Sequence, residues 1–459
     1  MNPAKWPKQQ LIDKIQNNIN MKKIIYILFI AALCSKLSAQ NDTLKLSLNQ
    51  ALQLGLANRF DAKANHLNID LAGNRLLKSR KELLPDLSGN AKLLYSGQIQ
   101  PSIIPAGYLG FTEPRKIAIG MKNNTSFSLD LNYVIYKPGL YTDIKIASNN
   151  LSMEEERNNK SEVNIRIEIA EAYDNVLLKS LQYGIARKNE NRYKEYYDLT
   201  KGKFTSGVIL ESDMLLAELD YKNEISGTEK QKQDLMLSTR NLKYKINLPE
   251  QTEIILTDSL SSNEEEISDV SPSDALTKRS EIRQLAIEQA GNELQLKKAK
   301  QNYFPSFSLF ANYTKFYQGP QFDYSNNFYW APVNYVGVKL SIPLTGNIKN
   351  INSVKEYKLK SAQTDFILMQ KTADIQYEVQ ESLTRLNNAK QNLFTAKDNY
   401  QLSQKVYELK KQQYDSGSFS YEKLLDTEKS LSATEQEYIS AVYSYLIAKI
   451  SYQKAKGDF

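Results

Sequence analysis

Residues 125–136 read TSFSLDLNYVIY, and residues 306–317 read SFSLFANYTKFY. Apolar and polar side chains alternate in both stretches, which is the pattern of a β-strand with one apolar face. Residues 87–96 and 335–342 alternate in the same way. Each stretch is about ten residues long, the length of a tilted strand that crosses an outer membrane. A soluble hairpin with one buried face is the alternative interpretation of the same pattern.

Long helices are predicted between and after these strands. Residues 139–248 and 344–459 contain no proline, the residue that most strongly interrupts a helix. Apolar side chains such as Ile169, Tyr173 and Val176 recur there at helical spacing, among many Glu, Lys, Gln and Asn residues. Such narrow apolar stripes are typical of helices that pack on neighbouring helices, as in coiled coils.

The two halves of the chain correspond to each other. The junction LLPDLS at residues 83–88 matches YFPSFS at residues 303–308. We therefore predict a tandem duplication, in which each half consists of a helix, a strand, a loop, a strand and a long helical hairpin. The expected domains are a first repeat at 41–247, a linker at 248–272 with a short strand around Ile254–Leu256, and a second repeat at 273–459.

The N-terminus has the features of a targeting segment. Residues 21–40 combine a basic start, ten apolar residues and the small residues Ser38 and Ala39, so we predict a secretory signal peptide. Residues 1–20 are then an upstream extension that is not native, with Met21 as the true start. Cleavage after Ala39 removes six lysines and one aspartate, so the formal net charge falls from +7 to +2. A charge-based case for nucleic-acid binding disappears with it.

Composition also argues against an enzyme. The chain has one histidine, His66, and one cysteine, Cys34, which excludes most zinc, haem, iron–sulfur and Cys/His nucleophile sites. The acidic runs at residues 154–156 and 264–266 are interpreted as solvated faces, and no glycine-rich phosphate loop is present. We therefore expect neither a catalytic site nor a metal or cofactor site.

The predicted strands place a demand on assembly. Four strands cannot close a barrel, for which about eight are the minimum. Open strand edges are not tolerated in hydrocarbon, because their N–H and C=O groups would have no partner. Several chains must therefore pool their strands, and with them their helices, into one conduit. The predicted fold class is mainly α: tandem-duplicated helical hairpins that form an α-barrel tunnel, with a membrane β-barrel.

The duplicated pattern resembles the TolC-like outer membrane efflux proteins over essentially all of residues 44–457. The resemblance is carried by LSLNQAL at 46–52, by the Leu-Pro and Phe-Pro junctions at 84–85 and 304–305, and by IPL at 342–344 followed by a glycine. It implies a homotrimer with a twelve-stranded barrel in the outer membrane and a helical tunnel in the periplasm. It also implies a periplasmic adaptor protein and an inner-membrane transporter as partners.

That resemblance implies a function and docking positions. The function is the exit duct of a tripartite efflux or type I secretion system, which passes small molecules or polypeptides to the exterior. The turns of the two hairpins are the implied adaptor docking tips. These are Ser206, Gly207 and Val208 in the first hairpin, and Ser416, Gly417 and Ser418 in the second.

Five residues near the tips fall on gate positions of the family. Asp426 matches an acidic ring position, whereas Lys423 stands where the family has a second acid. Asp213 matches a latch aspartate and Tyr414 a latch tyrosine, but Phe419 replaces the latch arginine. Each of these residues is also compatible with ordinary coiled-coil packing beside a turn.

The departures from the family pattern change the expected gate. Because Phe419 cannot pair with Asp213, the closed state is expected to depend on aromatic packing of Phe419, Tyr414 and Tyr421. Lys423 lies three residues before Asp426, so the two are expected to form an ion pair that weakens the acidic ring.

Two other functions remain open from the sequence. One is an exported structural coiled-coil protein without a pore, in which the strand segments would be soluble hairpins. The other is a passive nutrient porin, which would need many strands per chain and little helix.

Overall fold

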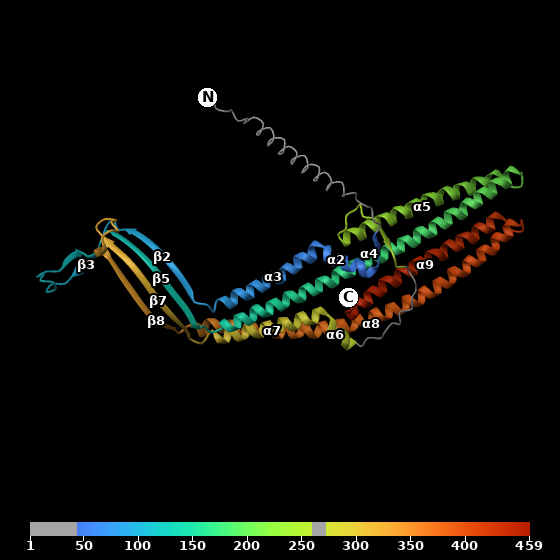
Figure 1. Ribbon diagram of the computed structural model, residues 1–459. Helices are drawn as coiled ribbons and strands as arrows, with labels where there is room; N and C mark the ends of the chain where they lie inside the picture. Colours follow the sequence, from blue (N-terminus) through green and yellow to red (C-terminus); the bar gives the residue numbers. More distant parts are fainter. Residues whose placement is uncertain (1–43, 259–271) are drawn as a thin grey trace, which may run out of the picture.

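The computed structural model of the protein describes residues 44–258 and 272–459. The molecule is elongated, with a β-sheet at one end and the turns of two helical hairpins at the other (Figure 1). Each half of the chain provides two shorter helices, two long strands and one hairpin, in that order. The predicted extension at 1–20 and signal peptide at 21–40 lie outside the described residues, as do residues 259–271 of the predicted linker.

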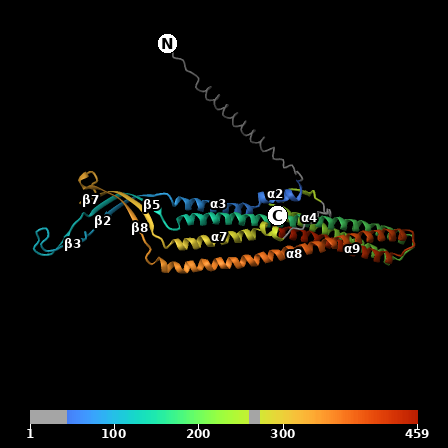
Figure 2. The ribbon, with the colours of Figure 1, turned by 90° about the horizontal axis from the view of Figure 1, so that it is seen from below.

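The two hairpins are built from unusually long helices. α4 (Leu140–Thr205) has 66 residues and pairs with α5 (Glu211–Lys245), while α8 (Gly346–Asp415) has 70 and pairs with α9 (Tyr421–Lys456). At 1.5 Å per residue, α4 and α8 are each about 100 Å long. Figure 2 shows the two hairpins running side by side to the same end of the molecule. This confirms the long helices predicted from the proline-free segments.

The described helices, in residues 44–258 and 272–459, include none that is long and apolar enough to cross a membrane.

Shorter helices pack against the half of the long helices that lies nearer the sheet. α3 (Phe60–Lys81) packs on α4, and α7 (Ser280–Gln301) packs on both α8 and α4. Arg283 of α7 donates to Glu156 of α4 at 2.7 Å, and Glu156 is buried. The interpretation of residues 154–156 as a fully solvated face is therefore wrong at Glu156. The helical period could not reveal this, because the partner comes from a helix distant in sequence.

A compact apolar core lies midway along the molecule. β1 (Leu44–Leu46) pairs in parallel with β6 (Ile254–Leu256), and α2 (Leu48–Asn58) packs on α4 beside them. α6 (Pro272–Lys278) packs separately on α8 and α9. Ser47 begins α2 with a capping box, in which its hydroxyl and the Gln50 side chain satisfy each other's backbone N–H groups. The core includes Leu46, Ile169, Tyr173, Val176, Leu242 and Ile246.

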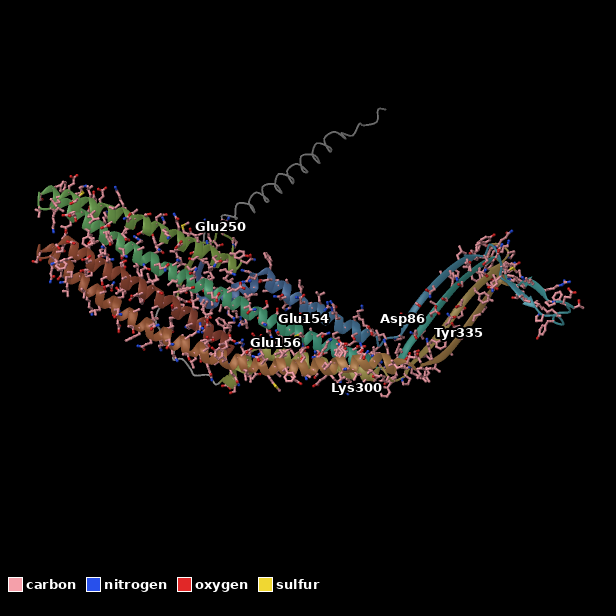
Figure 3. The ribbon with its side chains drawn as sticks, turned by 180° about the vertical axis from the view of Figure 1, so that it is seen from behind. Asp86, Glu154, Glu156, Glu250, Lys300 and Tyr335 are labelled. Atoms are coloured by element: carbon pink, nitrogen blue, oxygen red, sulfur yellow. The ribbon has the colours of Figure 1, made fainter. Side chains whose placement is uncertain are left out.

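Four antiparallel strands form the sheet, in the order β2-β5-β7-β8. They are β2 (Asp86–Tyr95), β5 (Asn123–Tyr136), β7 (Ser306–Gly319) and β8 (Trp330–Ser341). All four strands predicted from alternation are therefore present, within a few residues of the expected ends. The two repeats meet at the centre, where β5 pairs with β7, and β2 and β8 are left as edges. Figure 3 places Asp86 where the helices join the sheet and Tyr335 on the sheet itself.

The two faces of the sheet differ in chemistry. On one face large apolar side chains are exposed, including Phe127, Leu129, Val336 and Val338, with 52% to 73% of their surface accessible. The opposite face carries a polar network centred on Asp130. This carboxylate accepts hydrogen bonds from Asn90, Ser128 and Asn312, which come from β2, β5 and β7.

The end of the sheet far from the helices carries two features that the alternation did not predict. β3 (Pro101–Ile104) and β4 (Arg115–Ala118) form a separate small hairpin. The β7–β8 connection folds into an aromatic cluster around Tyr317, which is fully buried and contacts Tyr324, Tyr329 and Trp330 edge-on.

Candidate functional site

The predicted docking tips are two copies of one turn. α4 ends at Thr205, and the Val208 N–H donates to Lys203 O at 2.9 Å, while the Gly207 N–H donates to Phe204 O at 2.8 Å. This pattern is a Schellman motif, in which the residue after the C-cap adopts a left-handed conformation. Gly207 has φ 73°, which glycine adopts at no steric cost.

The second tip repeats this geometry 210 residues later. The Ser418 N–H donates to Gln413 O at 2.9 Å, the Gly417 N–H donates to Tyr414 O at 3.0 Å, and Gly417 has φ 80°. In both tips the glycine faces open space, because a Cβ added there would meet no atom within 4 Å. The duplication therefore extends to the hydrogen bonds of the turns.

The chemistry of the two tips differs. Val208 and Leu210 leave 69% and 71% of their surface exposed at the first tip, which makes it apolar. At the second tip Ser416 and Ser418 occupy the turn, and the Ser416 hydroxyl donates to Gln413 O at 2.9 Å. Ser206 behaves similarly at the first tip, where its hydroxyl donates to Gly202 O at 3.0 Å.

Two of the predicted gate residues are brought together by packing. Tyr414 is buried in an apolar cluster, and Phe419 packs against the same cluster. Lys203 of α4 lies 3.9 Å from the centre of the Tyr414 ring, a cation–π contact that joins the two hairpins. Tyr414 and Phe419 thus lie in one cluster, while the side chain of Tyr421 lies outside the described residues.

The remaining gate residues lie apart from that cluster. Asp426 and Lys423 are exposed on α9, and Asp213 is half-buried in the first turn of α5. Lys423 Nζ lies 6.0 Å from the centre of the Phe419 ring. Among the ion pairs of the described residues there is none between Lys423 and Asp426, so that expected pair is not formed in the single chain.

A buried ionic cluster joins the two hairpins further from the tips. Arg192 of α4 places Nη2 2.5 Å from Glu428 Oε1 and Nη1 3.7 Å from Glu435 Oε1, both on α9. Glu428 and Glu435 are only 1% and 2% exposed. Asn189 completes the contact, because its side-chain amide donates to Glu435 at 2.9 Å. We call this contact between α4 and α9, together with Tyr407 and Lys411 of α8, the seam.

Aromatic side chains surround the seam cluster. The Arg192 guanidinium lies 5.1 Å from the centre of the Tyr407 ring, and the Tyr407 hydroxyl hydrogen-bonds to that of Tyr196. Toward the middle of the molecule the seam becomes apolar, with Leu178, Ile185, Ile439 and Val442 in contact. Toward the tips, Lys411 of α8 pairs with Glu195 of α4 at 2.6 Å.

Burial controls the protonation of the cluster. Desolvation raises the pKa of Glu428 to about 7, although Arg192 acts in the opposite direction. Desolvation acts to lower the pKa of Arg192, but Glu428 and Glu435 outweigh it and the net shift is upward. Arg192 therefore stays charged while Glu428 titrates close to neutral pH.

The sequence analysis missed Arg192, Glu428 and Glu435, although a signal was present. Glu428 and Glu435 lie on the same stripe as Leu424 and Leu431, at the alternating spacing of four and three residues that marks a packed helix face. Charged residues on such a stripe are unusual, because burying a charge without a partner is costly. Glu428 and Glu435 are therefore recognisable from this stripe as candidates for buried ion pairs.

His66 is exposed on α3, and residues 44–258 and 272–459 contain no group of three or more His, Cys, Asp or Glu side chains arranged to hold a metal.

Residues 271–458 match the family model described as outer membrane efflux protein. No curated protein sequence is a significant match to the chain. The solved structures give a wider likeness, which covers both halves of the chain. CusC aligns with a TM-score of 0.71 at 19% identity, over 90% of this chain and 93% of that one.

Two further outer membrane proteins align in the same way. The CmeC outer membrane channel of Campylobacter jejuni has a TM-score of 0.68 at 18% identity, over 89% of this chain and 85% of that one. VceC of Vibrio cholerae has a TM-score of 0.68 at 13% identity, over 89% and 96%. At these identities the likeness shows the fold, and with the family match it confirms the resemblance inferred from the duplicated motifs.

Proposed function

We propose that this chain, which carries an outer membrane efflux protein domain over residues 271–458, is the exit duct of a tripartite efflux or type I secretion system. It resides in the outer membrane with its helices in the periplasm, and it transports solutes rather than catalysing a reaction. Its partners are two further copies of itself, a periplasmic adaptor and an inner-membrane transporter. Small molecules or polypeptides are the cargo.

One observation carries this proposal. The four-stranded sheet has two unpaired edges, β2 and β8, an exposed apolar face and a polar face with its own hydrogen-bond network. Three copies placed edge to edge supply twelve strands, which closes the edges and turns the apolar faces to lipid and the polar faces to a lumen. The helical hairpins then form a tube in line with that lumen.

The hairpin tips suit a docking role. Their turns lie at the end of the molecule opposite the sheet (Figure 1), so they would point toward the inner membrane. Exposed apolar residues at the first tip, Val208 and Leu210, offer a contact for the adaptor. The serine-rich second tip and Asp426 are proposed to border the periplasmic entrance, with Tyr414 and Phe419 packed behind it.

Mass measurement and conductance test the proposal together. The protein extracted in mild detergent should have the mass of three chains plus bound detergent, and it should form ion-conducting pores in planar bilayers. A stable monomer in detergent would overturn the trimer. A trimer that never conducts, with the entrance forced open or not, would instead favour the exported coiled-coil protein without a pore.

A further inference from the structure

The two hairpins contact each other near their free ends through the seam. The cluster of Arg192, Glu428 and Glu435 lies 13 residues before the end of α4. At 1.5 Å per residue this is about 20 Å from the tip. Any movement that separates the second hairpin from the first at its tip must therefore strain or break this cluster.

Burial of the cluster costs free energy unless its charges are paired. Two carboxylates and one guanidinium are withdrawn from water, and their mutual attraction must offset that desolvation. Separation of α9 from α4 would return Glu428 and Glu435 to water and leave Arg192 exposed on α4. The cluster thus has two well-defined states, paired and buried or separated and hydrated.

The contacts of the ionic cluster differ in kind from those of the side chains at the tips. Phe419 and Tyr414 pack through apolar contact, and Lys423 makes no ion pair with Asp426 in the described chain. Arg192 contacts acids on the other hairpin through two of its nitrogens. It is therefore a buried ionic contact between the hairpins, whereas the pair of Lys411 and Glu195 nearer the tips is more exposed.

We propose that Arg192, Glu428 and Glu435 are positioning residues of the entrance, and that their buried contact, in which Arg192 offsets the charge of the two acids, holds the second hairpin against the first in the closed state. This inference rests on the proposed function, because it assumes that the tips border an entrance. The residues act through the position of α9 and do not contact the cargo.

The seam should make the population of the closed state depend on pH. Glu428 has a pKa of about 7 in the buried cluster, whereas its ordinary value is 4.5. Opening of the seam would return Glu428 to its ordinary pKa, so opening releases a proton between pH 4.5 and 7. Lower pH within this window stabilises the closed seam, and higher pH favours opening. From pH 6 to pH 7 the ratio of open to closed protomers should rise about fivefold.

Other groups that face the cluster share its environment. They are Glu190, Tyr193 and Tyr196 of α4, Asp220 and Glu224 of α5, Tyr400, Tyr407 and Glu408 of α8, and Tyr438 of α9. Burial raises the pKa of Tyr196 and Tyr407, so both phenols remain protonated in this range. Burial also raises the pKa of Glu224, an effect of the same sign as that on Glu428.

A second buried acid lies on the seam closer to the core. Burial raises the pKa of Asp174 of α4 to about 6, although Lys449 of α9 acts in the opposite direction. With a pKa of about 6, Asp174 is still partly protonated between pH 6 and pH 7, so the Glu428→Gln variant, and not the pH interval alone, isolates the contribution of Glu428.

Spin-label distances in the full-length protein test the inference. Labels at Ser206→Cys and Ser416→Cys report the separation of the two tips, with trimers diluted in unlabelled chains so that one labelled copy is measured. Arg192→Met should increase the population of the longer distance at least tenfold at pH 7.5, because it leaves two buried carboxylates unpaired. Acidification to pH 5 should reverse part of this effect, since Glu428 is then protonated.

Matched variants separate the seam from general destabilisation. Arg157→Met makes the same chemical change on α4, but Arg157 pairs only with Glu154 of its own helix and should leave the distance unchanged. Glu428→Gln keeps the shape of the side chain and removes its titration. It should remove most of the change between pH 6 and pH 7, and it tests the inference even if Arg192→Met fails to fold.

The outcomes distinguish this inference from the proposed function. An unchanged tip distance in Arg192→Met at pH 7.5, or an unchanged pH response in Glu428→Gln, would overturn the seam as the closing contact even if the trimer conducts. A distance that responds as expected in a protein without conductance would leave the seam intact and refute the exit duct.

Discussion

Leu129→Arg is the most direct test of which face of the sheet meets lipid. Leu129 lies at the middle of β5, six residues from one end of the strand and seven from the other. At 3.3 Å per residue and a tilt of about 40°, it is roughly 15 Å from each end measured along the membrane normal. Leu129 therefore lies near the bilayer midplane, and 55% of its surface is exposed in the single chain.

The expected magnitude follows from that depth. An arginine that faces lipid at the midplane costs about 2–4 kcal/mol per strand position. A trimer carries three copies, so the assembled barrel should lose roughly 6–12 kcal/mol. The neighbouring variant Ser128→Arg lies at the same depth on the opposite face, where the new guanidinium can pair with Asp130. It should cost less than about 1 kcal/mol per chain.

The assay is insertion and stability measured on the two variants together. Outer-membrane fractions should contain heat-sensitive trimers of Ser128→Arg at the level of the unmodified protein, and few or none of Leu129→Arg. Urea titration of protein refolded into vesicles would give the free-energy difference. Equal insertion of the two variants would refute the assignment of the apolar face to lipid, and with it the membrane role of the sheet.

Two further predictions concern the tips. Gly207→Val and Gly417→Val force a β-branched residue into a positive φ. Each should therefore distort its turn and reduce efflux, while the trimer remains in the membrane. Gly207→Asn should retain efflux, because asparagine tolerates this conformation. Persistent efflux in both valine variants, measured by cargo accumulation, would place the adaptor contact elsewhere. Asp426→Ala should decrease cation selectivity in single-channel recordings, and Lys423→Ala should increase it, because removal of each charge changes the potential at the entrance. If selectivity stays constant in both, Asp426 does not face the lumen.

Much of the fold was accessible from residue patterns alone. Alternation has a period of two and a helix has a period of 3.6, and these local periods located all four long strands and the helical hairpins. The turn positions followed from Gly207 and Gly417, since few other residues adopt a positive φ readily. Even the polar and apolar faces of β5 could be assigned, because neighbouring side chains of a strand point to opposite sides.

The local residue pattern was less informative at the boundary between two helices and in very short strands. Phe60 continues the helical spacing of α2, yet it begins α3 and is 75% exposed, because Arg59 adopts an extended conformation between the two helices. The small β3–β4 hairpin has strands of only four residues, too short for alternation to be recognised.

The sequence by itself determined which segments are strands, helices and turns, and that the chain is duplicated, because those properties depend on near neighbours in the chain. Only the tertiary structure decided that β5 pairs with β7, that Glu156 meets Arg283, and that Arg192 is buried against Glu428. Arg192 and Glu428 are more than 200 residues apart, and each lies on an otherwise ordinary helix. Their contact depends on which helix faces meet and in what register, which is a property of packing between the two hairpins.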